Sequence, residues 1–447
     1  MTLLPVPEEH LAKLNPHLVA LLPPDTFQRQ TTIDPKMLVN PHRFDLAIKH
    51  LYARHRALGS KTLFHRNLYA AHIAVFSRGR FTEDDGSKSC LEDSIRNFDS
   101  LLDDIGPGGF NPGISMVPVG RRKVLIDGSH RGAACLFHRR PIDVLEFDLD
   151  AAIYDEKCFA QGLPDGGDSA AIEYCRICPN ARILTLFPVA KGKDERVREI
   201  LSHYGAIIHE KEVPIRVGAG LNVVRELYLG EPWLGTWRDG YGGAVGKATP
   251  CFAASGPMRV FIVHASESDS MIRAKTEIRN LWDLDRSVAH ATDTQGETLR
   301  VARALVLDGS IAFLNRFQGR YFERMEKMLD EWREWLAAMP DDEPWCVDGG
   351  SVLAACGLRA PGDLDVLHAD GSPPGAMAAS HNAYASLYPV PKDEIVFDPQ
   401  MHFWTRGVKF ANPGVVAGMK MRRNEPKDRT DVEMLREFEQ RLRLPGS

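Results

Sequence analysis

The segment from Trp345 to Leu367 constrains the fold of this chain more than any other stretch. An apolar strand leads into Gly349-Gly350-Ser351, a short helix follows, and a second apolar strand contains Asp363 and Asp365. Side chains two residues apart on a strand point to one face, so the two carboxylates are expected to lie together. Two such charges repel unless a cation lies between them, and Mg²⁺ prefers oxygen ligands. Because the turn's backbone N–H groups can hold phosphates, the segment predicts Mg²⁺-dependent nucleotidyl or phosphoryl transfer.

This pattern of a Gly-Gly-Ser turn, a helix and Asp-x-Asp resembles the polymerase-β-like nucleotidyltransferase superfamily over about residues 343–440. The resemblance implies a mixed sheet, with Mg²⁺ on Asp363 and Asp365 and the phosphates of ATP or CTP on the turn. Family members often supply a third carboxylate from a later strand, and an expected strand over 394–398 offers Asp398, with Glu394 as the other choice. The tail over 415–438 is similar to that of antitoxin-partner and aminoglycoside-type enzymes, which implies that Lys420 approaches the phosphates. The alternative is a degenerate fold that serves binding or scaffolding.

A second motif lies near the N-terminus. Residues 123–127 predict a strand, and a helix of small residues follows Arg131. A strand–turn–helix of this kind places backbone N–H groups, a histidine and an arginine at a helix N-terminus, where a phosphate can bind. The other interpretation is a turn with a structural His-Arg pair. The motif residues are Asp127, Gly128, Ser129, His130 and Arg131.

This second motif resembles the signature of the ParB/sulfiredoxin superfamily over about residues 60–150, in which the equivalent turn contacts nucleotide phosphates. Ser129 stands where sulfiredoxins carry a cysteine, which argues against the thiol chemistry of that branch. In the free-serine-kinase branch a carboxylate near residue 83 acts as general base, so the resemblance makes Glu83 a candidate. A solvated acidic loop is the alternative for Glu83.

The chain's length of 447 residues suggests about three domains. We expect an α/β (α+β) protein with a leader over 1–59, a ParB/sulfiredoxin-like unit over 60–150, a central α/β unit over 151–340 and a nucleotidyltransferase-like mixed-sheet unit over 343–447. Pro340-Asp-Asp-Glu-Pro344 is the clearest linker signal. No apolar run approaches about 18 residues and no secretory signal is visible, so neither a membrane span nor secretion is expected and a cytoplasmic location is the default.

The central segment contains candidates of lower specificity. Lys275 and Arg279 are one helical turn apart, so they share a face that either binds a phosphate or is solvated. His290, Asp293 and Glu297 could be metal ligands, but a capping box that starts at Thr294 explains Glu297 without a metal. The pair Cys175 and Cys178, with Cys158 and His203 or His209, could hold zinc, against the alternative of incidental thiols.

The net charge of the chain helps to distinguish a nucleic-acid partner from a small-molecule substrate. The chain has 60 acidic and 55 basic residues, a formal net charge of −5, whereas a protein that neutralises nucleic-acid phosphates usually carries a basic excess. We therefore expect a transferase or kinase that uses ATP or CTP on a small molecule or glycan precursor. One alternative is a ParB-like regulatory protein with a silent nucleotidyltransferase fold. Another is a toxin-type nucleotidyltransferase that acts on RNA or protein.

Overall fold

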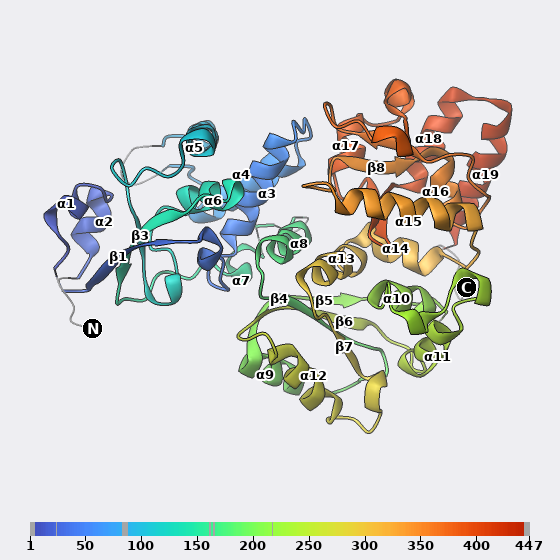
Figure 1. Cartoon of the computed structure of the whole chain (residues 1–447), viewed down its shortest axis with the longest axis horizontal. Helices are drawn as coiled ribbons and strands as arrows, with labels where there is room; N and C mark the ends of the chain where they lie inside the picture. The colour runs from blue at the N-terminus through green and yellow to red at the C-terminus, as the bar shows by residue number, and fades with distance from the viewer. Residues whose placement is uncertain are drawn as a thin grey trace. The chain divides into compact units, whose positions relative to one another are not determined.

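The computed structural model describes residues 5–23, 25–82, 88–160, 162–163, 166–216 and 218–441. The chain forms two compact units, shown in Figure 1. Unit 1 comprises Met1–Ala57 and Leu63–Ala181, and unit 2 comprises Leu58–Thr62 and Arg182–Ser447. Both units combine helices with small sheets, which confirms the mixed α/β class. Within the described residues, no helix combines the length and the apolar character that a membrane crossing requires.

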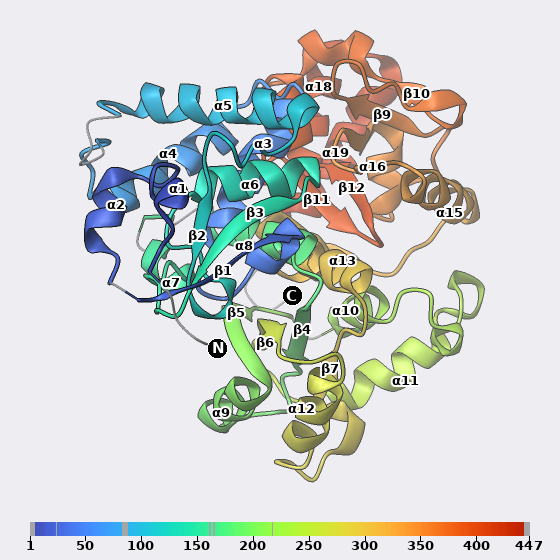
Figure 2. The same cartoon turned by 60° about the vertical axis from the view of Figure 1, so that its left-hand side comes forward.

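Unit 1 is built on a three-stranded sheet with β3 (Ile142–Phe147) at its centre. This strand pairs antiparallel with β1 (Phe27–Ile33) and parallel with β2 (Val117–Val119). Figure 2 shows α5 (Leu91–Gly108) and α3 (Asp45–Ala57) alongside α6 (Ser129–His138), and these helices share one apolar core with the sheet. The remaining α-helices of this unit are α1 (Glu8–Leu11), α2 (Pro16–Leu21), α4 (Phe64–Phe76), α7 (Glu156–Phe159) and α8 (Gly167–Ile177).

Two expectations for unit 1 were wrong. Residues 1–59 are not a separate leader, because Ile33, Leu38 and Leu46 are buried in the core of unit 1. Residues 123–127 do not form a strand, because only Leu125 makes a bridge, to Val119.

Unit 1 also continues past the boundary expected near residue 150. Glu173 on α8 accepts hydrogen bonds from Arg54 at 2.8 Å and from His50 Nδ1 at 2.6 Å, both on α3. Glu173 is 1% exposed, so these bonds tie α8 to the interior of unit 1.

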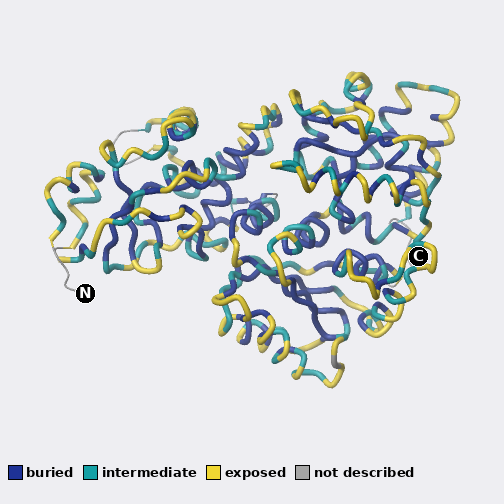
Figure 3. Tube along the Cα trace, viewed as in Figure 1, coloured by how far each residue is buried: buried dark blue, intermediate teal, exposed yellow. Residues whose placement is uncertain are grey.

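A four-stranded sheet lies in the first part of unit 2, in the order β5 (Gly205–Val213), β6 (Met258–Ala265), β4 (Ala181–Leu186) and β7 (Ala289–Ala291). One face packs against α9 (Asp194–Tyr204) and α12 (Ser270–Arg279), whose apolar side chains form a single core with the strands. Across the sheet lie α10 (Gly220–Leu227) and α13 (Gln295–Leu305), as Figure 1 shows. Figure 3 shows that β4, β6 and β7 are largely buried, whereas β5 is mostly half-buried.

A five-stranded sheet forms the C-terminal part of unit 2. Its order is β10 (Ala379–Ser380), β9 (Asp365–His368), β8 (Trp345–Asp348), β12 (Val408–Ala411) and β11 (His402–Thr405). The pairs β8–β9 and β11–β12 are antiparallel, whereas β9–β10 and β8–β12 are parallel. The other α-helices of unit 2 are α11 (Gly242–Cys251), α14 (Asp308–Arg316), α15 (Glu323–Ala337), α16 (Gly349–Ala355), α17 (Lys392–Phe397), α18 (Pro413–Arg423) and α19 (Pro426–Gln440).

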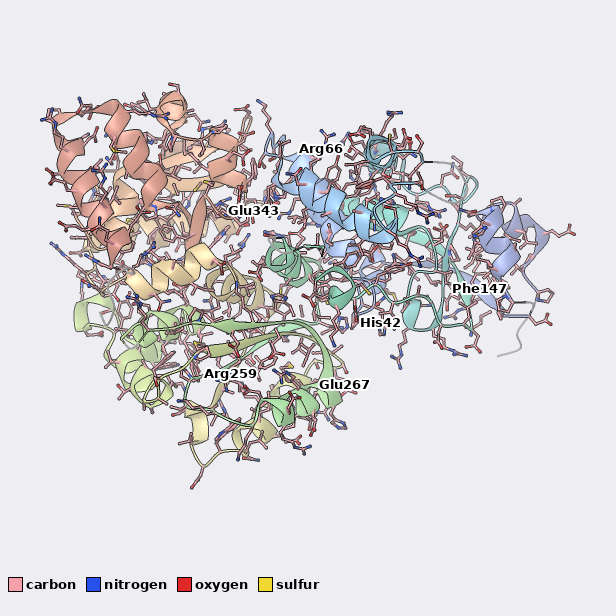
Figure 4. The ribbon with its side chains drawn as sticks, turned by 180° about the vertical axis from the view of Figure 1, so that it is seen from behind. His42, Arg66, Phe147, Arg259, Glu267 and Glu343 are labelled. Atoms are coloured by element: carbon pink, nitrogen blue, oxygen red, sulfur yellow. The ribbon has the colours of Figure 1, made fainter. Side chains whose placement is uncertain are left out.

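Ion pairs hold the expected linker at 340–344 within unit 2. Arg303 donates to both carboxylate oxygens of Asp342, at 2.5 and 2.7 Å, and to Glu343 at 3.0 Å. Glu343, labelled in Figure 4, also accepts from Lys409 Nζ at 3.1 Å. The boundary expected near 340 therefore does not separate compact units, because buried ion pairs hold the segment in place.

Candidate functional site

The turn before α6 is held in one shape by its own residues. Gly128 has φ +80°, and a Cβ atom there would lie 2.8 Å from the guanidinium of Arg131, so this position favours glycine. Arg131 donates to Asp127 Oδ2 at 3.0 Å and to the carbonyl oxygen of Met116 at 3.0 Å. The expected motif is thus brought together at the start of α6, and Ser129 is the first residue of that helix.

His130 is held as a neutral side chain. Its Nε2 shares a hydrogen bond with the hydroxyl of Tyr69 at 2.8 Å, and its ring meets Phe98 edge-on. Burial, together with the charges of Lys49 and Lys88, holds the pKa of His130 well below its ordinary value. The histidine of the motif therefore offers a hydrogen bond rather than a positive charge.

A cavity of about 1080 Å³ opens at this turn, entirely within unit 1. That volume is at the upper end of the roughly 300–1,000 Å³ that is usual for ligand sites. Among the described residues, Asp127 is the only carboxylate that lines it. The lysines and arginines that line it are Lys13, Arg43, Lys49, Arg80, Lys88 and Arg131. We call this cavity, with these seven charged residues, the basic cavity.

A buried ion network forms part of the wall of the basic cavity. Asp45 is fully buried and accepts from Arg43 Nε and Nη2, each at 2.8 Å, and from Lys49 Nζ at 2.7 Å. Burial lowers the pKa of Lys49 to about 8, although the Asp45 carboxylate opposes that shift. This network was not predicted from the sequence, although the four-residue spacing of Asp45 and Lys49 suits an ion pair on one face of a helix such as α3.

The second predicted site lies where β8 ends and β9 begins. Asp348 and Asp365 are directly opposite each other in the antiparallel pair. Gly349 has φ +59°, and a Cβ atom there would lie 2.3 Å from Asp365 Oδ2, so glycine lets this carboxylate lie against the turn. The backbone N–H of Gly350 donates to Asp365, and Ser351 Oγ donates to the carbonyl oxygen of Asp363 at 2.8 Å. The glycine-rich turn therefore positions the two predicted aspartates.

Asp348 was not predicted, yet it is the most buried group of this site. It is 0% exposed, and its Oδ2 accepts from His381 Nδ1 at 2.6 Å and from the hydroxyl of Tyr388. Its Oδ1 is buried without a hydrogen-bond partner among the described residues. Burial alone would lower the pKa of His381, but the hydrogen bond and charge of Asp348 outweigh burial and raise it.

Two carboxylates face each other at this site. Like charges directly opposite each other on neighbouring strands destabilise a sheet. Burial raises the pKa of Asp365, and the charges of Asp363 and Asp348 act in the same direction. The buried Oδ1 of Asp348 and the Asp365 carboxylate suit Mg²⁺, which usually takes one or two carboxylates together with substrate phosphates. Within the described ranges, no cluster of three or more His, Cys, Asp or Glu side chains is arranged to hold a metal ion.

The strand that was expected to carry Asp398 does not form. Residues 392–397 form helix α17 instead of a strand, and Asp398 ends that helix and accepts from the N–H of Gln400 at 2.9 Å. Burial raises the pKa of Asp398, and the neighbouring charge of Glu394 adds to that effect. On the side of β9 away from β8 lies β10, and His381, which directly follows β10, contacts Asp348.

Lys420 belongs to a buried network of ion pairs. It is 2% exposed, and its Nζ lies 3.3 Å from Asp428 and 2.8 Å from Asp431. Arg359 makes two bonds to Asp431, at 2.6 and 2.7 Å. These ion pairs connect α18 and α19 to the rest of unit 2, and the approach of Lys420 to nucleotide phosphates stays a prediction.

Two further predictions concern Glu83 and the cysteines. Glu83 lies outside the described residues, so its role as a base stays a prediction. All eight cysteines are free thiols; Cys175 and Cys178 are buried, and Cys158 is exposed. A zinc site at these thiols stays a prediction that no cluster of ligands among the described residues supports.

Comparisons of the chain with models of protein families, with curated proteins and with solved structures found no match.

Proposed function

We propose that this chain transfers a phosphoryl group from ATP or CTP to a small molecule or glycan precursor, with the nucleotide phosphates bound in the basic cavity. The observation that carries the proposal is the charge of that cavity, in which six lysines and arginines face a single described carboxylate. A nucleoside triphosphate is the common metabolite whose charge and size suit such a lining. The chain's net charge of −5 makes a cationic cavity a local feature, which favours a small polyanion over nucleic acid.

The cavity combines two means of holding phosphate. The N-terminus of α6, a helix of ten residues, presents backbone N–H groups and the positive end of its dipole. Lysine and arginine side chains add charge-assisted hydrogen bonds. Arg131 is already engaged by Asp127 and Met116, so its first role is to hold the turn. Arg80 is exposed at the surface, and Lys88 lies half-buried, so we assign phosphate contacts to these two.

Lys49 has a different part in the proposal. Its amine is held by Asp45 in the wall of the cavity, and its pKa of about 8 lies close to physiological pH. A phosphate near Lys49 would favour the charged amine, because an opposite charge raises the pKa of a lysine. Nucleotide binding is therefore expected to tighten as the pH falls through 8.

The proposal is tested with purified full-length protein and ATP. Arg80→Met and Lys88→Met each remove one charge-assisted contact, worth about 1.5–3 kcal/mol, so ATP should bind roughly ten- to a hundred-fold more weakly. Lys36→Met is the matched control, because Lys36 is exposed and does not line the cavity. Calorimetry gives the dissociation constants. Unchanged ATP binding in both cavity variants would show that the nucleotide site lies elsewhere.

A second candidate function is Mg²⁺-dependent nucleotidyl transfer at Asp365 and Asp348. The observation that favours it is the pair of facing carboxylates, one with a buried oxygen that has no hydrogen-bond partner in the described part of the chain. Bound Mg²⁺ would neutralise charge on a triphosphate at this position, while Gly349 and Gly350 keep the backbone close to the carboxylates.

Isotope labels separate the two candidates. The protein is incubated with a metabolite extract and with ATP or CTP labelled at either the γ- or the α-phosphate. Transfer of γ-label that Arg80→Met reduces would support the basic cavity, and transfer of α-label that Asp365→Asn abolishes would support the second site. Release of free phosphate that does not depend on any acceptor would favour a nucleotide-driven switch protein instead.

A further inference from the structure

A smaller cavity, of about 460 Å³, lies in the central part of unit 2, and neither proposed function uses it. Its lining comes from α12, α13, β7 and the segment after α10, which Figure 1 shows around the four-stranded sheet. The cavity brings together the pair Lys275 and Arg279 with the group His290, Asp293 and Glu297, which the sequence offered as two unrelated sets. We call it the central cavity.

Three cations from two helices face the central cavity. Lys275 and Arg279 lie one turn apart on α12, and Arg300 lies on α13. Arg279 donates from Nη2 to the carbonyl oxygen of Ala289 at 2.8 Å, while its Nε is buried without a hydrogen-bond partner among the described residues. Arginine and lysine in this arrangement suit the oxygens of one phosphate group.

Each carboxylate of the central cavity either accepts hydrogen bonds from other groups of the protein or lies at the exposed rim of the cavity. Glu297 accepts from His290 Nε2 at 3.2 Å and from the backbone N–H of Asp293 at 2.8 Å. The side chains of Asp293 and Glu231 are exposed. The interior is therefore cationic, whereas the rim offers carboxylate oxygens that accept hydrogen bonds from hydroxyl groups.

Aromatic rings form one wall. The ring of Tyr228 lies 4.5 Å from that of His290 and 5.0 Å from that of Trp233, centroid to centroid. Trp233 is 44% exposed, so much of its ring is available to a ligand. The C–H face of a sugar ring is apolar and flat enough to pack on such a surface.

We propose that the central cavity binds a phosphorylated monosaccharide, with its phosphate on Lys275, Arg279 and Arg300, its ring against Trp233, and its hydroxyls on the acidic rim. Three cations and three carboxylates line this cavity, so a triphosphate is a poorer match here than in the basic cavity. The site does not depend on either proposed function, because binding alone defines it.

The test measures binding by calorimetry with the 1- and 6-phosphates of glucose, galactose and mannose, and with inorganic phosphate and the three free sugars. At least one sugar phosphate should bind ten-fold or more tightly than both inorganic phosphate and its free sugar. Lys275→Met and Trp233→Ala should each weaken that binding ten-fold or more. Arg273→Met is the matched control on the same helix, because Arg273 is exposed and pairs with Glu267 at 2.9 Å outside the cavity.

In these binding measurements, the proposal would be overturned by no binding of any of the six sugar phosphates, by equal binding of inorganic phosphate, or by equal loss in Arg273→Met. Because ATP binding is measured separately with Arg80→Met, failure at the central cavity is distinguishable from failure at the basic cavity. Competition between ATP and the sugar phosphate would place both in one site and would also refute a distinct central site.

Discussion

Asp365→Asn is expected to stabilise unit 2 without Mg²⁺ and to destabilise it, relative to wild type, with Mg²⁺. Asp365 lies opposite Asp348, and burial and neighbouring charges raise its pKa. A carboxyl whose pKa is higher in the folded state weakens that state once the pH rises through this pKa, and the effect disappears in acid. Asparagine removes the charge, so the free energy of unfolding at pH 7 should rise by up to about 1 kcal/mol.

Adding Mg²⁺ should reverse the order of the two proteins. A ligand whose free concentration is a hundred times its dissociation constant stabilises the folded state by about 2.7 kcal/mol. Wild type gains this stabilisation and Asp365→Asn does not, so the variant becomes less stable by about 2 kcal/mol. His381 offsets part of the repulsion, which is why the gain without Mg²⁺ is the smaller of the two effects.

The assay is urea unfolding followed by tryptophan fluorescence, with EDTA or with saturating Mg²⁺. All seven tryptophans lie in unit 2, so the signal reports on the unit that holds the site. Asp283→Asn, at an exposed residue of the same unit, is the control and should change neither curve. Equal stabilisation of wild type and Asp365→Asn by Mg²⁺ would refute a cation site at these carboxylates.

Three further predictions concern the buried charges and the thiols. Asp45→Asn leaves two buried cations without their carboxylate, so unit 1 should lose about 3–5 kcal/mol in urea unfolding followed by circular dichroism, and a loss below 1 kcal/mol would contradict this. Despite burial, the ion pair with Arg423 holds the pKa of Asp428 at about 2, so its contribution to stability should be lost as the pH falls from about 4 to 2, and acid unfolding of Asp428→Asn should lack this step. Cys158 is exposed, so a thiol reagent should label it in the native protein well before the six buried cysteines; rapid labelling of a buried one would show that its core opens.

Local patterns predicted several elements of the fold correctly. Thr294 caps α13, accepting from the N–H of Glu297, as the capping box predicted. The strand before Gly349 also forms where expected, whereas the strand after it begins only at Asp365 and leaves Asp363 outside, on an exposed bend. The prediction of a strand over 394–398 was wrong, because three consecutive apolar residues suit a buried strand or a buried helix equally. The sequence did contain an indication of a helix. Pro391 directly precedes it, and Asp393 and Glu394 lie in its first turn.

In the candidate sites too, local features could be predicted from the sequence and contacts between distant residues could not. The predicted turns over 127–131 and 349–351 depend on neighbouring residues, so the sequence could indicate them. Asp348 and His381 are 33 positions apart, and their contact depends on which strands pair. Strand order and register are not local properties, so no short motif could place His381 beside Asp348. The basic cavity was missed for the same reason, because its cations come from five separate segments.

The short segment Leu58–Thr62 has a consequence for synthesis of the protein on the ribosome. It belongs to unit 2, although the chain on either side of it belongs to unit 1. The hydroxyl of Thr62 donates to Glu394 at 2.7 Å, a partner that is made 332 residues later. At about 5–20 residues per second, this segment emerges roughly 15–65 s before its partner exists. Unit 1 can therefore fold around an open loop, whereas unit 2 closes only after nearly the whole chain has been translated.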